Sequence, residues 1–224
     1  MDSAALFLSL KLATATTAVL LAVGVPIAAW LAFTRRRFAF AVEAIVALPL
    51  VLPPTVLGFY LLVALGPRSP LGRLLETWTG TRLVFTFEGL LVASVLYSLP
   101  FAVQPFASAF ASVEPRLLEA SWCLGASRVR TFVRVVLPLS RRGLVTGAVL
   151  AFAHTLGEFG VVLMVGGNIP GLTRTASIAI YDDVQALDYA RAGATSVVLL
   201  AVSFAVLLLT YALRRDVRLA VRWK

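Results

Sequence analysis

Long apolar stretches alternate with short polar segments along almost the whole chain. Five of these stretches exceed the roughly 20 residues that a helix needs to cross the hydrocarbon of a bilayer. A membrane-spanning segment must satisfy its backbone hydrogen bonds internally, and a helix does so. The pattern therefore predicts an all-α integral membrane protein with about five transmembrane helices. The predicted spans cover approximately residues 6–33, 40–66, 89–111, 143–167 and 192–213.

Composition agrees with the apolar pattern. Hydrophobic residues make up 60% and charged residues only 14% of the 224 residues, and the mean hydropathy is +0.92. Soluble domains are far less apolar. Five spans and their loops use nearly the whole length, so we expect residues 1–224 to form a single transmembrane domain with no separate catalytic domain.

The polar segment between residues 168 and 192 is mildly acidic, because three aspartates stand there against two arginines. Within it, residues 172–181 form an apolar run that is too short to cross a bilayer. We expect this run to lie at the membrane interface or to re-enter the protein. A sixth span is the alternative.

Basic residues are distributed unevenly between the polar segments. Most of them follow the first, third and fifth apolar stretches. Positive residues stay on the cytoplasmic side of membrane proteins, so this bias predicts an external N-terminus and a cytoplasmic C-terminus. It also accounts for the net charge of +9 without a nucleic-acid partner. The cytoplasmic set comprises Arg35, Arg36, Arg37, Arg116, Arg128, Arg130, Arg134, Arg141, Arg142, Arg214, Arg215, Arg218, Arg222 and Lys224.

The sequence lacks the residues for several kinds of chemistry. Cys123 and His154 are the only cysteine and histidine, which argues against a Cys/His metal site and against a membrane-embedded enzyme. A phosphate-binding loop needs a lysine followed by Ser or Thr, and neither Lys11 nor Lys224 is followed by one. We therefore expect a non-enzymatic subunit without a metal or cofactor, and any ATP must bind to a separate subunit.

Glu158 is the one acid that stands clearly inside a predicted span. His154 and Thr155 precede it by four and three residues and share its helix face. One interpretation makes this face a pore lining or a proton relay. The alternative, which we favour, is a carboxyl group that is hydrogen-bonded to backbone at a break flanked by Gly157 and Gly160, because an unpaired buried charge is costly.

Prolines are frequent in the second and third predicted spans. Each one removes a backbone hydrogen bond, so we expect these two helices to bend or break. Bent helices can surround a transport pathway, but kinks are also ordinary in packed membrane bundles. The prolines are Pro49, Pro53, Pro54, Pro100 and Pro105.

The loop at about residues 112–142 combines arginines with a helical pattern. Pro115 suits the first turn of a helix and Gly125 the position just past its end, which predicts one short helix between them. Ser127 is a candidate N-cap for a second helix that ends near Pro138. Amphipathic helices in this position either dock in a groove of a partner protein or lie on lipid headgroups.

This loop resembles the cytoplasmic motif of ABC importer permeases, which reads E-A-A, three residues, G, nine residues and I-x-L-P. The chain has matching residue types at the same spacing, with Ser121 and Val135 as mild departures. The resemblance implies the fold of a type I ABC importer permease, in which this loop docks into the ATPase subunit. The implied docking residues are Glu119, Ala120, Ser121, Gly125, Val135, Leu137 and Pro138.

Three further segments are similar to molybdate permeases, and this similarity covers nearly the whole chain. They are residues 48–54 (LPLVLPP), 157–160 (GEFG) and 166–181, which contains GNIPG and TASIAIY. Sulfate permeases share the last two segments but typically carry an additional helix, so sulfate or thiosulfate is the alternative substrate. The resemblance implies import of molybdate, with tungstate as a related substrate, across a bacterial inner membrane.

The resemblance also implies three partners: a second copy of this chain in a homodimer, a cytoplasmic ABC ATPase subunit and an extracytoplasmic molybdate-binding protein. A tetrahedral dianion in transit should meet weak, dispersed hydrogen-bond donors, because a strong site would trap it. A protein of another class, an ATP-independent anion channel or carrier, is the remaining alternative and would need no docking loop. The candidates for the translocation path or gate are Ser98, Gln104, Thr155, Glu158 and Asn168.

Overall fold

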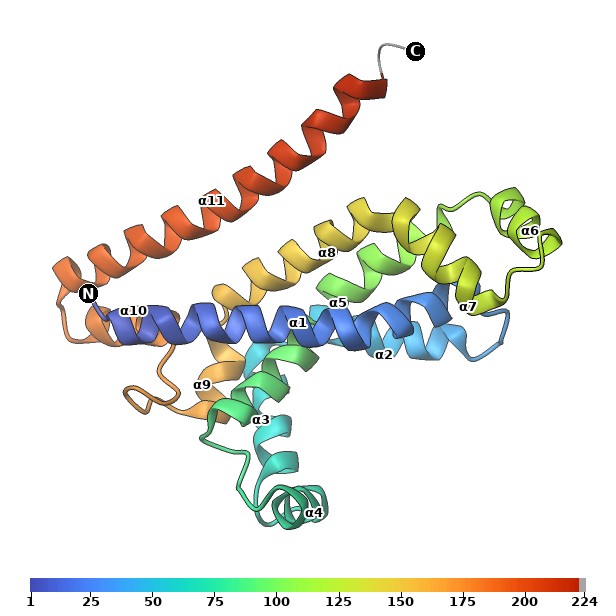
Figure 1. The fold of residues 1–224 in the computed structure, drawn as a ribbon. Helices are drawn as coiled ribbons and strands as arrows, with labels where there is room; N and C mark the ends of the chain where they lie inside the picture. The colour runs from blue at the N-terminus through green and yellow to red at the C-terminus, as the bar shows by residue number, and fades with distance from the viewer. Residues whose placement is uncertain (222–224) are drawn as a thin grey trace.

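The computed structural model describes residues 1–221, and every element within that range is a helix (Figure 1). This confirms the all-α prediction for the described part of the chain. The helices are α1 (Ser3–Phe33), α2 (Ala39–Val51), α3 (Pro54–Leu65), α4 (Pro70–Thr79), α5 (Phe87–Ala111), α6 (Pro115–Cys123), α7 (Arg128–Thr131), the π-helical turn η1 (Phe132–Val136), α8 (Leu137–Leu156), α9 (Gly160–Gly166), α10 (Ala176–Gln185) and α11 (Tyr189–Val221).

All five predicted spans are represented, although their ends are shifted. Four segments are long and apolar enough to cross a membrane, namely Ser3–Phe33, Phe87–Ala111, Arg128–Leu156 and Tyr189–Leu208. Helices α2 and α3 make a fifth candidate, bent by 114° at the break between them. The described residues hold no sixth span, since α10 is only 10 residues long. Arg222 and Lys224 lie outside the described residues.

Helices α1, α5 and α8 pack against one another and form the main core. Leu20 on α1, Val103 and Phe106 on α5, and Ala151 on α8 are fully buried there. Glycine permits the close approach of α5 and α8, because a Cβ atom on Gly147 would lie 2.5 Å from the Phe106 ring. Lipid provides no hydrophobic drive between helices, so close packing around small residues stabilises this bundle.

The second predicted span breaks at Pro53 and Pro54, as its prolines predict. Pro54 excludes the helical conformation at the residue before it, and Pro53 is accordingly extended, with φ −55° and ψ 136°. The third predicted span behaves differently, because α5 runs unbroken with Pro100 and Pro105 inside it. An isolated proline such as Pro100 or Pro105 removes one backbone hydrogen bond from its helix. In the adjacent pair, Pro54 also forces Pro53 out of the helical conformation, which ends the helix there. Of the two outcomes expected for the third span, a bend or a break, the break is therefore absent.

The fourth predicted span differs most from the structure. Its helix begins at Arg128 rather than at 143, and the second loop helix does not end near Pro138 but continues into α8. The turn just before α8, η1, is a π-turn, in which the Leu137 N–H bonds to the Phe132 carbonyl five residues earlier. A proline ring clashes with the carbonyl four residues before it. The wider π-turn just before Pro138 is the observed alternative to a helix end.

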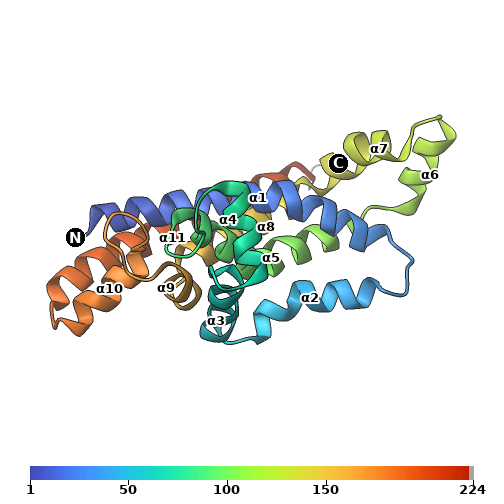
Figure 2. The same cartoon turned by 90° about the horizontal axis from the view of Figure 1, so that it is seen from below.

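The segment after α1 and the loop of α6 and α7 lie at one end of α1, and the loop between α9 and α10 lies near the other end (Figure 1, Figure 2). Helix α4 projects from the middle of the bundle instead (Figure 1). At the N-terminal end, the Arg174 guanidinium lies 3.2 Å from the Asp182 carboxylate and 3.9 Å from that of Asp2. The Ala176 N–H at the start of α10 donates a 2.8 Å hydrogen bond to the Ser9 hydroxyl on α1. Helix α10 therefore packs on the protein.

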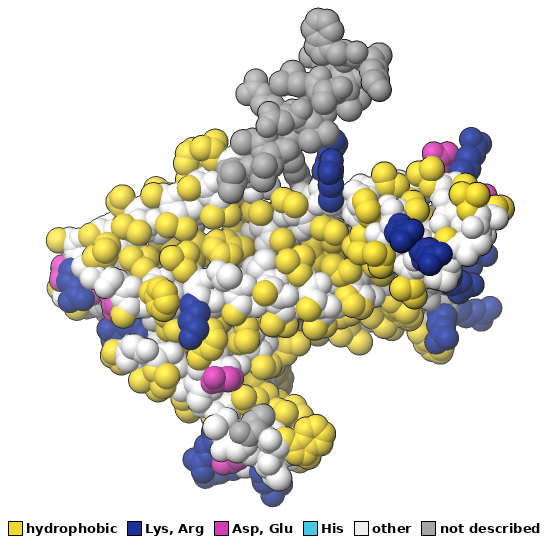
Figure 3. All heavy atoms as spheres, viewed as in Figure 1, with side chains coloured by type: hydrophobic (Ala, Val, Ile, Leu, Met, Phe, Trp, Pro, Cys, Tyr) yellow, Lys and Arg dark blue, Asp and Glu magenta, His cyan; other side chains and the backbone are white. Residues whose placement is uncertain are grey.

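The other end of α1 lies beside α6 and α7. Basic side chains gather at that end of the molecule, while the flanks of the bundle are mostly hydrophobic (Figure 3). Arg35 and Arg36, which follow α1, line the same groove as Glu119 and Trp122 of α6. The two basic segments that follow the first and third spans are therefore neighbours in space.

The α5–α8 contact predicts a difference between two helical glycines. Gly147→Ala should lower the melting temperature in detergent, because the added methyl group meets the Phe106 ring and overpacking costs about 1–3 kcal/mol. Gly193→Ala on α11 is the control, since its Cβ would meet nothing within 4 Å. Melting by intrinsic fluorescence measures both. Equal melting temperatures for the two variants would contradict the proposed packing role of Gly147.

Candidate functional site

Helix α6 stands apart from the helix core at one end of the molecule (Figure 1). None of its residues is buried. Pro115 occupies the first turn of α6 as predicted. A backbone N–H at this position would have no hydrogen-bond acceptor within the helix, so its absence in proline costs nothing. Large apolar side chains remain uncovered in this single chain, including Trp122 at 48% exposure and Leu124 at 88%. An exposed apolar surface at this position can contact either a partner protein or lipid.

Gly125 ends α6 through a left-handed conformation, with φ +81°. Its N–H bonds to the Trp122 carbonyl at 2.9 Å, and the Ala126 N–H bonds to the Ser121 carbonyl at 3.1 Å. These two bonds form a Schellman motif, which satisfies the last carbonyls of a helix. A Cβ atom at Gly125 would meet nothing within 4 Å. The glycine is therefore required by its backbone conformation and not by crowding.

A hydroxyl pair joins α6 to α7. The Ser121 and Thr131 hydroxyls lie 2.9 Å apart, and Thr131 is buried. Ser127 caps α7 as predicted, because its hydroxyl accepts a 3.3 Å hydrogen bond from the Arg130 N–H. The departure from the family motif at Ser121 thus has a structural role that alanine would not fill. Thr131 was not among the predicted residues, since nothing local in the sequence pairs it with Ser121.

The predicted docking residues fall into two groups. Glu119, Ala120, Ser121 and Gly125 lie on α6 or at its end, and Glu119 and Ala120 are exposed. The second group lies at the base of the loop, where η1 passes into α8. Of these residues, Pro138 is exposed and two are partly buried. The second group comprises Val135, Leu137 and Pro138.

A buried polar cluster joins α5 to α8 and to the break that follows α8. The Ser94 hydroxyl donates a 2.9 Å hydrogen bond to the Glu158 carboxylate. The Ser98 hydroxyl, one helical turn further along, lies 2.9 Å from His154 Nδ1 and 2.9 Å from the Thr155 hydroxyl. Both serines are fully buried. The face that the spacing predicts for His154, Thr155 and Glu158 therefore meets two serines of α5.

Glu158 lies at the predicted glycine-flanked break, but its hydrogen bond differs from the expected one. Its partner is the Ser94 side chain and not the backbone. Glu158 is 5% exposed, and its second oxygen, Oε1, has no hydrogen-bond partner among the described residues. The sequence predicts a backbone partner because the neighbouring backbone N–H groups are the nearest donors along the chain. The observed donor, Ser94, lies 64 positions away and could not be predicted in this way. A cavity of about 590 Å³ borders the carboxyl group.

His154 is held by aromatic rings as well as by Ser98. The Phe101 ring stacks on the imidazole with centroids 3.9 Å apart, and the Tyr97 ring lies at 4.7 Å. Tyr97 and His154 line the same cavity as Glu158. Thr55 of α3 also lines it, so hydroxyl groups from two helices, α3 and α5, border this space.

The other two candidates for the translocation path lie elsewhere. Gln104 is exposed on α5, away from the buried cluster. Asn168 is exposed in the loop before α10, where it donates a 2.6 Å hydrogen bond to Asp182 and accepts one of 2.6 Å from Arg174. The structure therefore brings Ser98, Thr155 and Glu158 together and leaves Gln104 and Asn168 apart from them.

Comparison with known proteins places this arrangement in a family. The family described as binding-protein-dependent transport system inner membrane component matches residues 24–219. The chain belongs to this family. The matched region includes α6, the π-turn and the whole buried cluster.

Two curated relatives of the permease family indicate where the chain lies within it. The molybdenum transport system permease protein ModB of Azotobacter vinelandii is 55% identical over 214 residues, which cover 96% of this chain and 95% of that protein. The probable sulfate transport system permease protein cysT of Prototheca wickerhamii is 34% identical over 177 residues, covering 79% of this chain and 68% of that protein. The molybdenum permease is thus the more similar of the two.

A solved structure shows the same fold at low sequence identity. The MetNI methionine ABC transporter, crystallised in inward facing conformations, contains a chain that superposes with a TM-score of 0.69 and 20% identity. The match covers 95% of this chain and 94% of that chain. This likeness, together with the family match, confirms the fold of a type I ABC importer permease.

The buried cluster predicts unequal effects of two serine substitutions on α5. Ser98→Ala should lower stability by about 1–2 kcal/mol, because His154 and Thr155 lose their shared partner in a buried site. Ser108→Ala changes an exposed serine of the same helix and should have little effect. Thermal melting of the purified variants in one detergent measures both. If the Ser98→Ala variant has the same melting temperature as the wild type, the cluster does not stabilise the contact between α5 and α8.

Proposed function

We propose that this chain is the membrane-spanning permease subunit of an ATP-driven importer for molybdate, with tungstate as a second substrate of the same shape and charge. The observation that carries the proposal is the 55% identity to a molybdenum permease over 96% of the chain. The sulfate alternative has weaker support, because the relative of that kind is 34% identical over a shorter region.

The loop at α6 is the proposed docking site for a cytoplasmic ABC ATPase. Three features support this role: the motif spacing, the exposed apolar side chains of α6 and the Gly125 cap that fixes the end of the helix. ATP would bind to that partner, and this chain would need no cofactor of its own. Two short helices with an apolar surface suit insertion into a groove of a protein partner.

The proposed transporter contains two copies of this chain in a bacterial inner membrane, with the loop at α6 in the cytoplasm. An extracytoplasmic molybdate-binding protein delivers the oxyanion to the opposite side. Nucleotide binding changes the conformation only if the ATPase dimer binds nucleotide more tightly in one state. The resulting movement of the docking loops drives alternation between outward-facing and inward-facing cavities.

The cavity at Glu158 supports a role near the translocation path. Thr55 and Tyr97 supply neutral hydroxyl groups to its lining, and the buried Ser98 and Thr155 hydroxyls lie behind His154, which also lines it. Neutral donors bind an oxyanion weakly enough to release it, whereas an ionised Glu158 would repel it. We propose that Ser98 and Thr155 line or support the path and that Glu158 holds the break after α8 in position. Gln104 and Asn168 would act, if at all, at separate points.

Docking through α6 predicts opposite results for two substitutions of Gly125. Gly125→Val should reduce copurification of the ATPase subunit by about five- to thirtyfold, because a β-branched residue at positive φ costs about 1–2 kcal/mol and releases the Schellman motif. Gly125→Asn should retain the partner, since asparagine tolerates this conformation. Membrane insertion should be normal in both. Full copurification with the valine variant would contradict docking at this helix end.

The substrate proposal is tested by reconstitution with the ATPase and the binding protein. Molybdate and tungstate should stimulate ATP hydrolysis and enter liposomes, and sulfate at the same concentration should do so much less. Stronger stimulation by sulfate would overturn the substrate assignment while leaving the importer proposal intact. Uptake of molybdate by liposomes that contain this chain without the ATPase would instead support an autonomous channel or carrier.

A further inference from the structure

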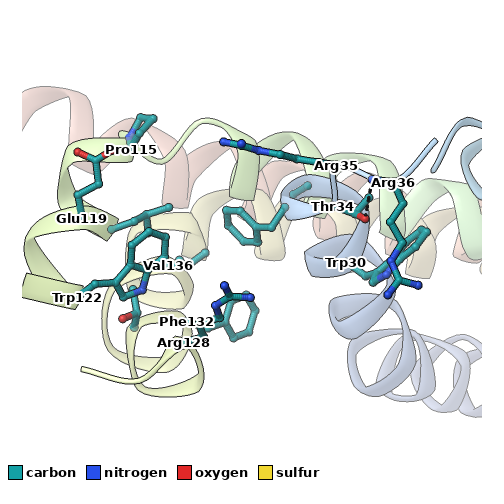
Figure 4. A pocket seen from close by; sticks show the side chains of 14 residues that line it. Trp30, Thr34, Arg35, Arg36, Pro115, Glu119, Trp122, Arg128, Phe132 and Val136 are labelled. Carbon is teal, nitrogen blue, oxygen red and sulfur yellow. Dashed lines mark hydrogen bonds between the residues drawn. The ribbon is translucent and has the colours of Figure 1, made fainter. Parts of the chain in front are cut away.

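A large groove lies between the end of α1 and the loop that carries α6 and α7. Its volume is about 1030 Å³. Trp30 and Phe33, from the last turn of α1, form one side, and Trp122 of α6 lies on the other (Figure 4). Phe132 and Val136 of η1 line the groove between them. The floor is therefore apolar, and it lies where the membrane span of α1 ends.

Cations line the rim of this apolar floor. Arg35 and Arg36 follow α1, and Arg128 begins α7. Arg35 extends from the α1 side toward the α6 side (Figure 4). Among the side chains that the structure describes, none forms an ion pair with any of the three guanidinium groups. Glu119 is the one acidic residue of the lining, and it stands on the wall opposite Arg36. The groove is thus positively charged.

From this combination we infer that the groove binds an anionic phospholipid of the cytoplasmic leaflet. Arginine forks recognise phosphate oxygens, and basic pockets at the cytoplasmic ends of transmembrane helices bind anionic headgroups. An acyl chain would lie along Trp30 and Phe132, and tryptophan prefers this depth of the membrane. A free anion would use the arginines but would leave the apolar floor uncovered.

The surface of α6 lies partly inside and partly outside the groove, because Glu119 and Trp122 line it while other exposed residues do not. Leu117, Ala120 and Leu124 are exposed and do not line the groove. The groove instead faces α1 and the base of the loop, on the side where the spans end. A lipid in it would contact the segment after α1 and the docking loop at once. It would thereby connect two parts of the chain that no ion pair joins within the described residues.

Retention of lipid by the full-length chain tests this inference. The chain is assembled in nanodiscs that mix phosphatidylcholine with a minor fraction of phosphatidylglycerol, and bound lipid is counted by native mass spectrometry. Arg35→Gln together with Arg128→Gln should weaken phosphatidylglycerol binding by about 30-fold, the loss expected for two cations near the membrane surface. Arg141→Gln together with Arg142→Gln is the matched control, because both arginines are exposed on α8 outside the groove. The control should retain the lipid.

Four outcomes would overturn the inference. Equal loss of lipid in the test and control variants would show attraction to the basic surface in general. Unchanged retention in the test variant would show that the groove holds no anionic lipid. Complete displacement of the lipid by an equal concentration of inorganic phosphate would identify a site for a free anion. Loss of ATPase copurification with lipid retained, in the variant that lacks Arg35 and Arg128, would assign the groove to the protein partner.

Discussion

The contact between α5 and α8 determines the position of both candidate functional features. The loop that carries α6 and α7 joins the ends of these two helices on one side, and the buried serines join them to the Glu158 break on the other. Phe106 packs against Gly147 between these points. Because lipid competes equally well for apolar side chains, the contact depends on close fit and on hydrogen bonds that lipid cannot offer. A change in this contact would therefore displace the loop and the cluster together.

The balance of polar and apolar groups along this contact is consistent with a part that must move. The Ser98 hydroxyl is fully buried and lies within hydrogen-bond distance of Nδ1 of the partly buried His154, so two neutral groups pair there. Glu158 is only half satisfied by protein groups in the described residues, and it borders a cavity. The helix end next to it therefore carries a buried oxygen that is unpaired among the described residues, whereas the core at Phe106 is closely packed and apolar.

Features with local causes could be predicted from the sequence, and features that depend on distant contacts could not. The extent of α6 follows from Pro115 and Gly125, which act on their own backbone. The break at Pro53 and Pro54 is equally local. The Ser94 partner of Glu158 lies on another helix, and the sequence holds no signal that aligns the two except the four-residue spacing of Ser94 and Ser98. The groove depends on how the end of α1 meets the loop, which no single segment specifies.

Proline also shows why local rules mislead in a membrane protein. Pro138 suggests a helix end, but the chain passes through a π-turn just before it and the helix continues without interruption. The helical segment from Arg128 to Leu156 is continuous over 29 residues, but it bends between α7 and α8 (Figure 1). Helix α8 alone has 20 residues, which extend about 30 Å at 1.5 Å per residue. A tilt of α8 by one degree about the end that carries Pro138 therefore moves the opposite end, next to Gly157, by about 0.5 Å.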